Sequence, residues 1–421
     1  MRDTQVTVIG GGAAGMTAAI TAAQSGADTV LIEHMDRVGK KLLSTGNGKC
    51  NFTNLKQDLS WYRGENPAFV LPVFAQFGQK ETFAFFETIG IYPKVKNGYC
   101  YPASGQASSV LDALRMECAY QGVETVTSCA LWSVEKSKNG YRIGTDKGAF
   151  FTTSLIFATG LLAAPKTGSD GSAIPYIEGL GHHFIDIVPA LVQLQGKQSF
   201  FKSVAGIRAD CEVTLFVENE QICSETGELQ LTGFGISGIP VFQLSRFATK
   251  ALFQKKEVHT SLNFLPELLP SQAFTLMQKR FRQNGHGKNA AEALIGLFPK
   301  KLIDVFLAES RISRDMPAAD VRLAALQRLS ETVRAIRVDV IASRGMEAAQ
   351  VCAGGVDTRE VDNETLESKF AKGVYFAGEV LDIDGACGGY NLQWAWSSGH
   401  VAGIHAAERA KQSAPRKRGT S

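Results

Sequence analysis

Three glycines near the N-terminus have the spacing of a phosphate-binding turn. Gly10, Gly12 and Gly15 follow the apolar run of residues 6–9 and precede a helix-forming segment, residues 16–25. In such a turn the first glycine bends the chain, the second lets the backbone approach a pyrophosphate, and the third lets helix and strand pack closely. The helix N-terminus adds free N–H groups and a positive dipole end. The pattern predicts a dinucleotide-binding unit; the alternative is an ordinary glycine-rich βα turn.

A carboxylate stands at the end of the next predicted strand, residues 29–32. Glu33 follows the glycines by roughly twenty residues, the offset at which a carboxylate holds the ribose hydroxyls of a bound dinucleotide. We therefore expect Glu33 to contact a ribose.

The loop after Glu33 is rich in glycine, lysine, hydroxyl and amide groups over residues 37–51. Such a loop can wrap a polar, anionic ligand through its backbone N–H groups, and its glycines favour a close backbone approach. The alternative is a solvated surface loop. Lys40, Lys41, Asn47 and Asn51 are its candidate ligand contacts.

A second informative stretch lies near the C-terminus. Residues 373–378 form an apolar strand that ends at Glu379, and residues 385–389 form a glycine loop that opens a helix reaching about residue 410. We expect this strand to return to the parallel sheet, so that the first domain is discontinuous. Glu379 would then meet ribityl or ribose hydroxyls, and the helix N-terminus near Gly389 would direct N–H groups at an electron-rich flavin carbonyl.

The length, net charge and cysteine content of the chain limit the classes of protein to which it can belong. A chain of 421 residues is expected to form two or three domains, and its formal net charge of +3 gives no support to a nucleic-acid or membrane partner. The eight cysteines include no C-x-x-C pair, which favours reduced thiols in a cytoplasmic protein over disulfides, zinc or a dithiol reductase. No apolar run is long enough for a membrane span, and the first strand leaves no room for a signal peptide.

The middle of the chain predicts a different architecture. Short alternating segments at residues 191–194, 211–217, 221–223, 228–231 and 258–264 favour a small antiparallel sheet or barrel. Residues 231–240 are predicted as a glycine-rich loop, and residues 353–356 as a turn. Helical periodicity dominates residues 270–337, and two strands are expected between residues 338 and 351 to complete the barrel.

Together, these motifs resemble a bacterial family of FAD-dependent oxidoreductases whose members are labelled aminoacetone oxidase-like and 3-dehydro-bile acid reductase-like. The resemblance covers nearly the whole chain and is carried by residues 10–15, 39–51, 235–238, 353–356 and 378–393. It implies an α/β fold with a Rossmann-like FAD domain (residues 1–189 and 352–410), an inserted β-barrel domain (190–264 and 338–351), a helical insert domain (265–337) and a flexible basic tail (411–421).

The resemblance also implies the site residues. The residues expected to bind FAD are Gly10, Gly12, Ala14, Gly15, Glu33, Lys40, Lys41, Asn47, Asn51, Leu131 (through its backbone), Thr159, Gly160, Gly378, Glu379, Gly389, Tyr390, Asn391 and Leu392. The family commonly has Ala-Thr-Gly-Gly where this chain has Leu161 after Gly160, which puts the local path beside the cofactor in doubt. No metal is expected, and no second glycine motif for a nicotinamide cofactor is evident.

Three functions remain open from the sequence. One is NAD(P)H-linked reduction of a conjugated C=C bond, in a bile-acid-like enone, by hydride transfer through flavin N5. Another is O₂-dependent oxidation of a small amine, and the third is a flavin-binding scaffold without catalysis. Tyr390, Cys387, Tyr101 and His182 or His183 are candidate proton donors that the sequence does not rank. A small molecule is the expected substrate; the oligomeric state stays open.

Overall fold

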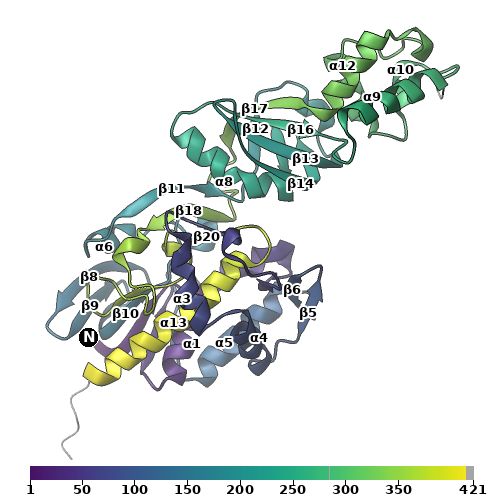
Figure 1. The fold of residues 1–421 in the computed structure, drawn as a ribbon. Coiled ribbons are helices and arrows are strands. Elements are labelled where there is room, and N and C mark those ends of the chain that lie inside the picture. The colour runs from purple at the N-terminus through teal and green to yellow at the C-terminus, as the bar shows by residue number, and fades with distance from the viewer. Residues whose placement is uncertain (284, 414–421) are drawn as a thin grey trace, which may run out of the picture. The chain divides into compact units, whose positions relative to one another are not determined.

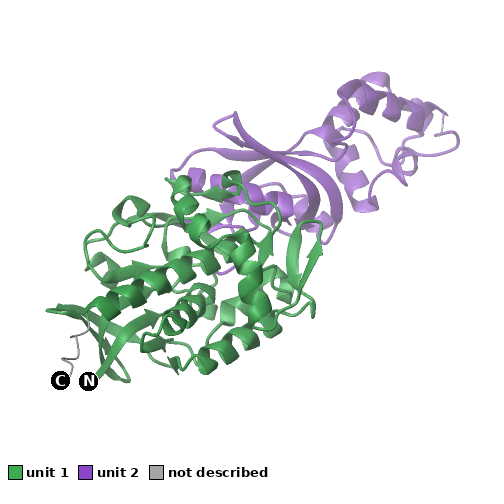
Figure 2. Ribbon diagram, turned by 60° about the horizontal axis from the view of Figure 1, so that its bottom comes forward, with its two compact units in different colours: residues 1–187, 350–421 green, residues 188–349 purple. Residues whose placement is uncertain are grey.

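The computed structural model describes residues 1–283 and 285–413, which form two compact units. One unit comprises residues 1–187 and 350–413, and the other residues 188–349 (Figure 2). The predicted basic tail lies outside the described residues from residue 414 on, whereas residues 411–413 belong to the last helix. In the described part of the chain, no helix combines the length and the hydropathy that crossing a bilayer requires.

The first unit is built on a mixed sheet whose parallel strands are β7 (Glu124–Val126), β2 (Thr29–Ile32), β1 (Arg2–Ile9), β10 (Gly148–Phe157) and β19 (Val374–Phe376). The chain leaves β1 for β2 on one side and reaches β10 on the other. Strand order therefore reverses between β1 and β10, and in open α/β sheets ligands bind at such a switch point.

β10 pairs with two different strands along one edge. Its first half pairs antiparallel with β9 (Gly140–Thr145), which pairs in turn with β8 (Leu131–Ser137). Its second half pairs in parallel with β19, Leu155 opposite Val374 and Phe157 opposite Phe376. The C-terminal strand thus returns to the first sheet, as the sequence predicts.

Helices α1 (Ala13–Gln24) and α13 (Tyr390–Ser413) lie side by side in this unit (Figure 1). Small residues permit their close approach: a Cβ at Gly399 would lie 2.4 Å from the carbonyl oxygen of Ala14, and one at Gly403 would lie 2.5 Å from that of Ala18. The other helices of the unit are α2 (Lys40–Ser44), α3 (Val70–Gln76), α4 (Gln79–Thr88), α5 (Ala107–Tyr120) and α6 (Ile174–Glu178).

Three short sheets complete the unit. They pair β3 (Thr53–Asn54) with β6 (Tyr99–Pro102) and β5 (Pro93–Lys96), β4 (Tyr62–Arg63) with β20 (Asp384–Gly385), and β11 (Phe184–Ala190) with β18 (Val351–Val356). The predicted turn at residues 353–356 is therefore wrong: these residues belong to β18. Gly355 is needed there because a Cβ would lie 2.7 Å from the carbonyl carbon of Leu381, so the glycines serve a close strand approach.

The second unit contains a closed barrel of β12 (Leu194–Gly196), β15 (Gly235–Gly238), β14 (Glu220–Thr232), β13 (Arg208–Val217), β16 (Val258–Asn263) and β17 (Ile336–Ser343). Alternate residues of its strands fill the interior of the barrel. In β13 these are Cys211, Val213 and Leu215, which are fully buried. The predicted α/β fold with a Rossmann-type domain and a β-barrel is thus confirmed.

Three local predictions for the barrel are wrong. The two short segments at 221–223 and 228–231 are one strand, β14, because polar residues alternate along it instead of forming a turn. The predicted loop 231–240 contains β15, where a Cβ on Gly235 would lie 2.1 Å from the carbonyl oxygen of Leu194 in the neighbouring strand. Of the two strands expected at 338–351, the barrel holds only β17.

Helices also belong to the second unit: α7 (Phe201–Val204), α8 (Ile239–Phe253), and, between β16 and β17, α9 (Pro270–Gln278), α10 (Ala290–Leu294), α11 (Lys300–Glu309) and α12 (Leu323–Arg334). One continuous apolar cluster runs from the barrel strands into α9–α12.

Candidate functional site

Two of the predicted glycines are required by the fold itself. Gly10 has a φ of +101°, and a Cβ there would lie 2.5 Å from the carbonyl oxygen of Ala158, at the end of β10. A Cβ on Gly15 would lie 1.8 Å from the carbonyl oxygen of Gly10. These glycines let β1, α1 and the end of β10 meet at the switch point.

Gly12 is different, because nothing in the protein requires a glycine there. Its φ is −79°, which any L-residue adopts, and an added Cβ would meet no atom within 4 Å. This open space lies at the N-cap of α1, where the helix dipole favours an anion. The residues present therefore fit a pyrophosphate, which would occupy the space that a side chain would fill.

Glu33 is a buried carboxylate held by the backbone, with only 8% of the residue exposed. Its Oε2 accepts a hydrogen bond from the N–H of Gly11 and its Oε1 accepts one from the N–H of Met35, both at 2.8 Å. His34 Nδ1 also lies 3.1 Å from Oε1, and these three contacts leave about one further acceptor site on a carboxylate, which accepts up to about four hydrogen bonds. Glu33 can thus accept from a ribose hydroxyl without giving up its own supports.

Lys41 and Glu379 are brought together from distant parts of the sequence. Lys41 Nζ donates to Glu379 Oε2 at 2.6 Å, and Glu379 Oε1 accepts from the N–H of Cys352 at 2.8 Å. Both side chains are largely buried, so the pair fixes the α2 loop against the end of β19. Lys40 instead pairs with the exposed side chain of Asp36.

The turn after β19 packs against the start of α1. Gly378 has a φ of +77°, and its added Cβ would lie 2.8 Å from that of Ala14. Its N–H donates to Ser398 Oγ at 2.8 Å, and its carbonyl accepts from Trp394 Nε1 at 3.1 Å. The structure thereby places the C-terminal motif beside the phosphate-binding turn.

The N-terminus of α13 faces the strand that follows the lysine loop. A Cβ on Gly389 would lie 2.7 Å from the carbonyl of Thr53 and 3.1 Å from Asn51 Oδ1, which itself accepts from the N–H of Cys100. The first hydrogen bond within the helix runs from the N–H of Gln393 to the carbonyl of Gly389. The N–H groups of residues 390–392 therefore have no acceptor within the helix and point toward its N-terminal end. An electron-rich ligand could accept hydrogen bonds from them there.

The Asn391 side chain has a structural role in the loop that precedes α13. Its Oδ1 accepts from the N–H of Gly385 at 2.8 Å and its Nδ2 donates to the Gly385 carbonyl at 2.7 Å. The predicted flavin contacts of Asn391 and Leu392 stay predictions, and for Asn391 the backbone is the group not used in these bonds.

The remaining predicted contacts lie in separate segments of the chain. Asn47 is exposed in a left-handed turn with a φ of 54°, and the carbonyl of Leu131 accepts from the hydroxyl of Tyr176 at 3.2 Å. Thr159 and Gly160 follow β10 directly, Gly160 with a φ of +65°. The departure at Leu161 is accommodated, because its side chain is buried and its N–H donates to Ser169 Oγ at 3.1 Å.

Three of the candidate proton donors, Tyr390, Cys387 and Tyr101, lie near a further tyrosine, Tyr99, that the sequence analysis did not single out. His182 and His183 instead contact Glu360. An added Cβ on Gly388 would lie 3.0 Å from Tyr99 Cε1 and 3.2 Å from Tyr390 Cε2. Tyr99 and Tyr101 share one face of β6, and each interacts electrostatically with Cys387. The sequence Tyr-Cys-Tyr could have indicated Tyr99, because residues two apart in a strand share a face and Tyr101 was already a candidate.

Exposure separates these four residues. Tyr390 is 3% exposed and its ring stacks on Trp61 at a centroid distance of 5.2 Å, whereas Tyr99, Tyr101 and Cys387 are half-buried. Burial raises the pKa of Tyr390 to about 12 and also raises the pKa values of Tyr99, Tyr101 and Cys387. All four groups therefore hold their protons at neutral pH.

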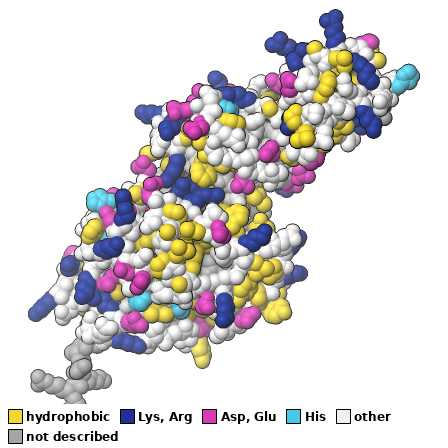
Figure 3. Space-filling model, viewed as in Figure 1, with side chains coloured by type: hydrophobic (Ala, Val, Ile, Leu, Met, Phe, Trp, Pro, Cys, Tyr) yellow, Lys and Arg dark blue, Asp and Glu magenta, His cyan; other side chains and the backbone are white. Residues whose placement is uncertain are grey.

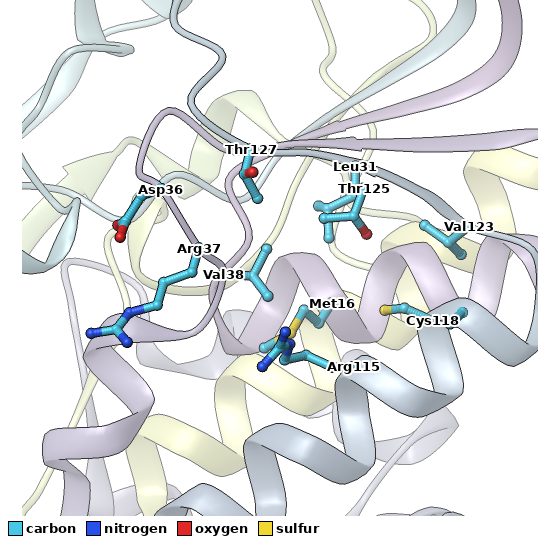
Figure 4. A pocket seen from close by; sticks show the side chains of 11 residues that line it. Met16, Leu31, Asp36, Arg37, Val38, Arg115, Cys118, Val123, Thr125 and Thr127 are labelled. Carbon is cyan, nitrogen blue, oxygen red and sulfur yellow. The ribbon is translucent and has the colours of Figure 1, made fainter.

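A separate pocket of about 370 Å³ lies behind the loop that follows Glu33 (Figure 4). Its walls include Met16 of α1, Leu31 of β2 and Cys118 of α5. None of the residues predicted to bind the cofactor lines it, so it is distinct from the glycine turn.

The fold and the glycine turn define an FAD-binding oxidoreductase of the Rossmann type. The chain belongs to the HI0933-like family, because a family model described as the HI0933-like protein Rossmann domain matches residues 4–405. This confirms the resemblance inferred from the motifs.

Two relatives and one solved structure show the range of this similarity. The chain is 42% identical over 407 residues to a 3-dehydro-bile acid delta(4,6)-reductase of Clostridium scindens, covering 96% of this chain and 99% of that protein. It is 30% identical to a ribosomal RNA dihydrouridine synthase of Escherichia coli, covering 93% and 95% of the two chains. A 3-ketosteroid delta1-dehydrogenase of Sterolibacterium denitrificans has a similar fold, with a TM-score of 0.50, 12% identity and coverage of 97% and 100%.

Proposed function

We propose that this chain is an FAD-dependent, NAD(P)H-linked reductase of a C=C bond conjugated to a carbonyl group in a steroid-like molecule. The observation that carries the proposal is the 42% identity to the bile acid reductase, which extends over nearly the full length of both chains. Bound FAD, once reduced by NAD(P)H, would supply a hydride from its N5 position to the β-carbon of the enone, and a proton donor would supply the proton for the other carbon.

The names of the two relatives describe a common type of chemistry. Dihydrouridine differs from uridine by saturation of a C=C bond conjugated to a ring carbonyl, as in an enone. A reductase of either substrate needs a hydride donor on one carbon and a proton donor for the other. The amine oxidation left open by the sequence matches neither of these names.

The chain's own residues would hold the cofactor in three groups. We assign the pyrophosphate to the turn with Gly10, Gly12 and Gly15, where Gly12 leaves space at the N-cap of α1. Glu33 would accept from the ribose, and the Lys41–Glu379 pair would meet the ribityl chain. The N-terminus of α13, at Gly389, would direct its N–H groups at the ring.

A half-buried tyrosine of β6 is the proton donor in this proposal. Tyr101 and Tyr99 are accessible from one side of β6, whereas the ring of Tyr390 is enclosed by Trp61 and Tyr62. The raised pKa of Tyr101 keeps its hydroxyl protonated, which a general acid requires. Cys387 lies next to them and helps to form the same surface.

An RNA substrate, suggested by the second relative, is the competing proposal. Two of the basic residues between α9 and α12 are committed to the fold, since Arg280 Nε donates to the carbonyl of Ala293 at 2.8 Å and Arg282 Nη1 to that of Ala318 at 3.1 Å. On the face that Figure 3 shows, Lys and Arg predominate over α9–α12, and basic and acidic side chains are mixed elsewhere. The two arginine contacts and the higher identity to the bile acid reductase favour a small molecule.

Steady-state turnover tests the proposal. NADH or NADPH should be consumed with a 3-oxo-4-ene bile acid and not with the matched saturated 3-oxo compound, and the product should carry two added hydrogens. Consumption with unmodified ribosomal RNA, and none with the bile acid, would favour the RNA substrate instead.

A further inference from the structure

His34, directly after the ribose carboxylate, lies between two carboxylates. Its Nδ1 is 3.1 Å from Glu33 Oε1, and its Nε2 is 3.4 Å from Asp170 Oδ2. Both are ion-pair distances when the ring is protonated, and only the imidazolium carries a proton on each nitrogen toward the acceptor oxygens. The geometry is that of an imidazolium joining two segments that are distant in the sequence.

Asp170 belongs to the loop that follows β10, residues 160–171. Gly168 of this loop has a φ of +104°, and an added Cβ would lie 2.8 Å from Met35 Cγ and 3.2 Å from His34 Cε1. The first half of the loop is anchored by the buried Leu161 and Ala163. The second half reaches the segment after Glu33 through Gly168 and the His34–Asp170 contact.

The charges around His34 favour its cationic form. The hydrogen bond and the charge of Glu33, together with the charge of Asp170, raise the pKa of His34 above its ordinary value of 6.5. Partial burial and the charge of Lys40 oppose this shift, and Lys40 is itself paired with Asp36. The two carboxylates outweigh the opposing effects.

We propose that His34 is a positioning residue for the adenosine half of FAD. As a cation that bridges Glu33 and Asp170, His34 holds the 160–171 loop against the ribose carboxylate. This inference rests on the proposed function only in taking FAD as the ligand of the glycine turn. The anionic pyrophosphate would further favour the cation, so FAD binding takes up a proton.

The sign of the pH dependence follows from this linkage. A group whose pKa is raised contributes fully below its unperturbed value and loses its contribution as the pH rises through the raised value. FAD affinity should therefore be highest near pH 6 and fall toward alkaline pH.

Two variants separate this role from a structural one. Asp170→Asn keeps the Oδ1 that accepts from the N–H of Ser172 at 3.0 Å and removes the charge opposite Nε2. His34→Gln keeps one donor but no titratable group. Asp112→Asn is the matched control, since it removes the same charge from a side chain that is 63% exposed on α5.

The experiment is a fluorescence titration of the flavin-stripped full chain with FAD from pH 6 to 9. The Kd of the wild type and of Asp112→Asn should rise over this range, by about tenfold for each unit by which FAD binding raises the pKa of His34. Asp170→Asn and His34→Gln should bind more weakly at pH 6. The Kd of His34→Gln should change little with pH, and that of Asp170→Asn should change less than that of the wild type.

Two results would overturn the inference: an Asp170→Asn variant that follows the wild type at every pH, or a His34→Gln variant that keeps the wild-type slope. A protein that binds FAD with this pH profile but reduces no enone would contradict only the proposed reaction. Complete absence of FAD binding would overturn both.

Discussion

The backbone N–H of Gly11 donates a 2.8 Å hydrogen bond to the carboxylate of Glu33. This bond ties the phosphate-binding turn to the end of β2 across 22 residues of sequence, and it does so within the protein alone. The predicted contacts to a pyrophosphate and to a ribose therefore have a fixed separation before any ligand binds. Such preorganisation reduces the ordering cost of binding.

Gly12→Ala should leave the fold intact and weaken FAD binding. The added methyl group meets no protein atom within 4 Å, but it would occupy the space left for the pyrophosphate. We expect a loss of at least about tenfold in affinity, or roughly 1.4 kcal/mol. Flavin content and thermal melting of the purified variant measure the two effects.

Gly15→Ala provides the contrast, because its Cβ would lie 1.8 Å from the Gly10 carbonyl oxygen. This variant should lose about 1–3 kcal/mol of stability through overpacking. If Gly12→Ala bound FAD as tightly as the wild type, the pyrophosphate would have to lie elsewhere.

Glu33→Ala should weaken FAD binding by about 1.5–3 kcal/mol for each lost hydrogen bond to the carboxylate. It should also lower the unfolding temperature, because the N–H groups of Gly11 and Met35 lose their acceptor. Isothermal titration with FAD compares it with Glu87→Ala, an exposed residue of α4. Equal FAD affinities in the two variants would show that Glu33 does not bind the ribose.

The local strand–turn–helix pattern was sufficient to predict the close packing at Gly10 and Gly15, whereas the ligand contacts of the glycines and of Glu33 stay predictions. Gly10 and Gly15 are explained by packing that any such unit needs, and the acid stands at a characteristic offset. The predictions at residues 231–240 and 353–356 failed because a glycine that admits a neighbouring strand cannot be distinguished, within its own segment, from one that bends the chain. Gly235 and Gly355 are both of the first kind.

Lys41 and Glu379 should show coupling in a double-mutant cycle. Each single variant, Lys41→Met or Glu379→Gln, removes one side of a largely buried contact, and the double variant removes both. The double variant should therefore be more stable than the sum of the single losses predicts, by about 0.5–3 kcal/mol in free energy of unfolding. Urea denaturation measures this coupling, and strict additivity would show that the pair does not act as a unit.

Tyr101→Phe should slow reduction of the enone by about 10²–10⁴-fold while leaving reduction of the flavin by NAD(P)H unchanged. Tyr99→Phe should slow enone reduction less, because Tyr99 acts only through the neighbouring Tyr101. Tyr92→Phe, 77% exposed, is the control. Stopped-flow kinetics measures flavin reduction by NAD(P)H and enone reduction separately. An equal loss of rate in both half-reactions would indicate damage to the flavin site rather than loss of a proton donor.

Deprotonation of the tyrosine should limit the rate only at alkaline pH. Burial and the neighbouring Tyr99 and Cys387 raise the pKa of Tyr101 above its ordinary value of 10.0, so the protonated acid persists to at least that pH. Under saturating reductant, any falling limb of enone reduction due to this group should have its midpoint above pH 10. A limb with a midpoint near neutrality that disappears in Tyr101→Phe would contradict this assignment.

Contacts between distant segments account for the part of the site that the sequence left unpredicted. Tyr99 joins Cys387 and Tyr390 only because β6 lies beside Gly388, and His34 meets Asp170 only because the loop after β10 returns to β2. Neither relationship leaves a periodic or spacing signal in the chain. The burial of Tyr390, which distinguishes it from Tyr101, likewise depends on Trp61 and Tyr62.

The most direct test of the central claim is anaerobic reoxidation of the reduced protein. The purified chain should show a flavin spectrum that NADH or NADPH bleaches, and a stoichiometric 3-oxo-4-ene bile acid should then restore the oxidised spectrum without oxygen and yield the saturated product. A reduced flavin that stays bleached with the enone, or an oxidised flavin that a small amine bleaches instead, would contradict the account.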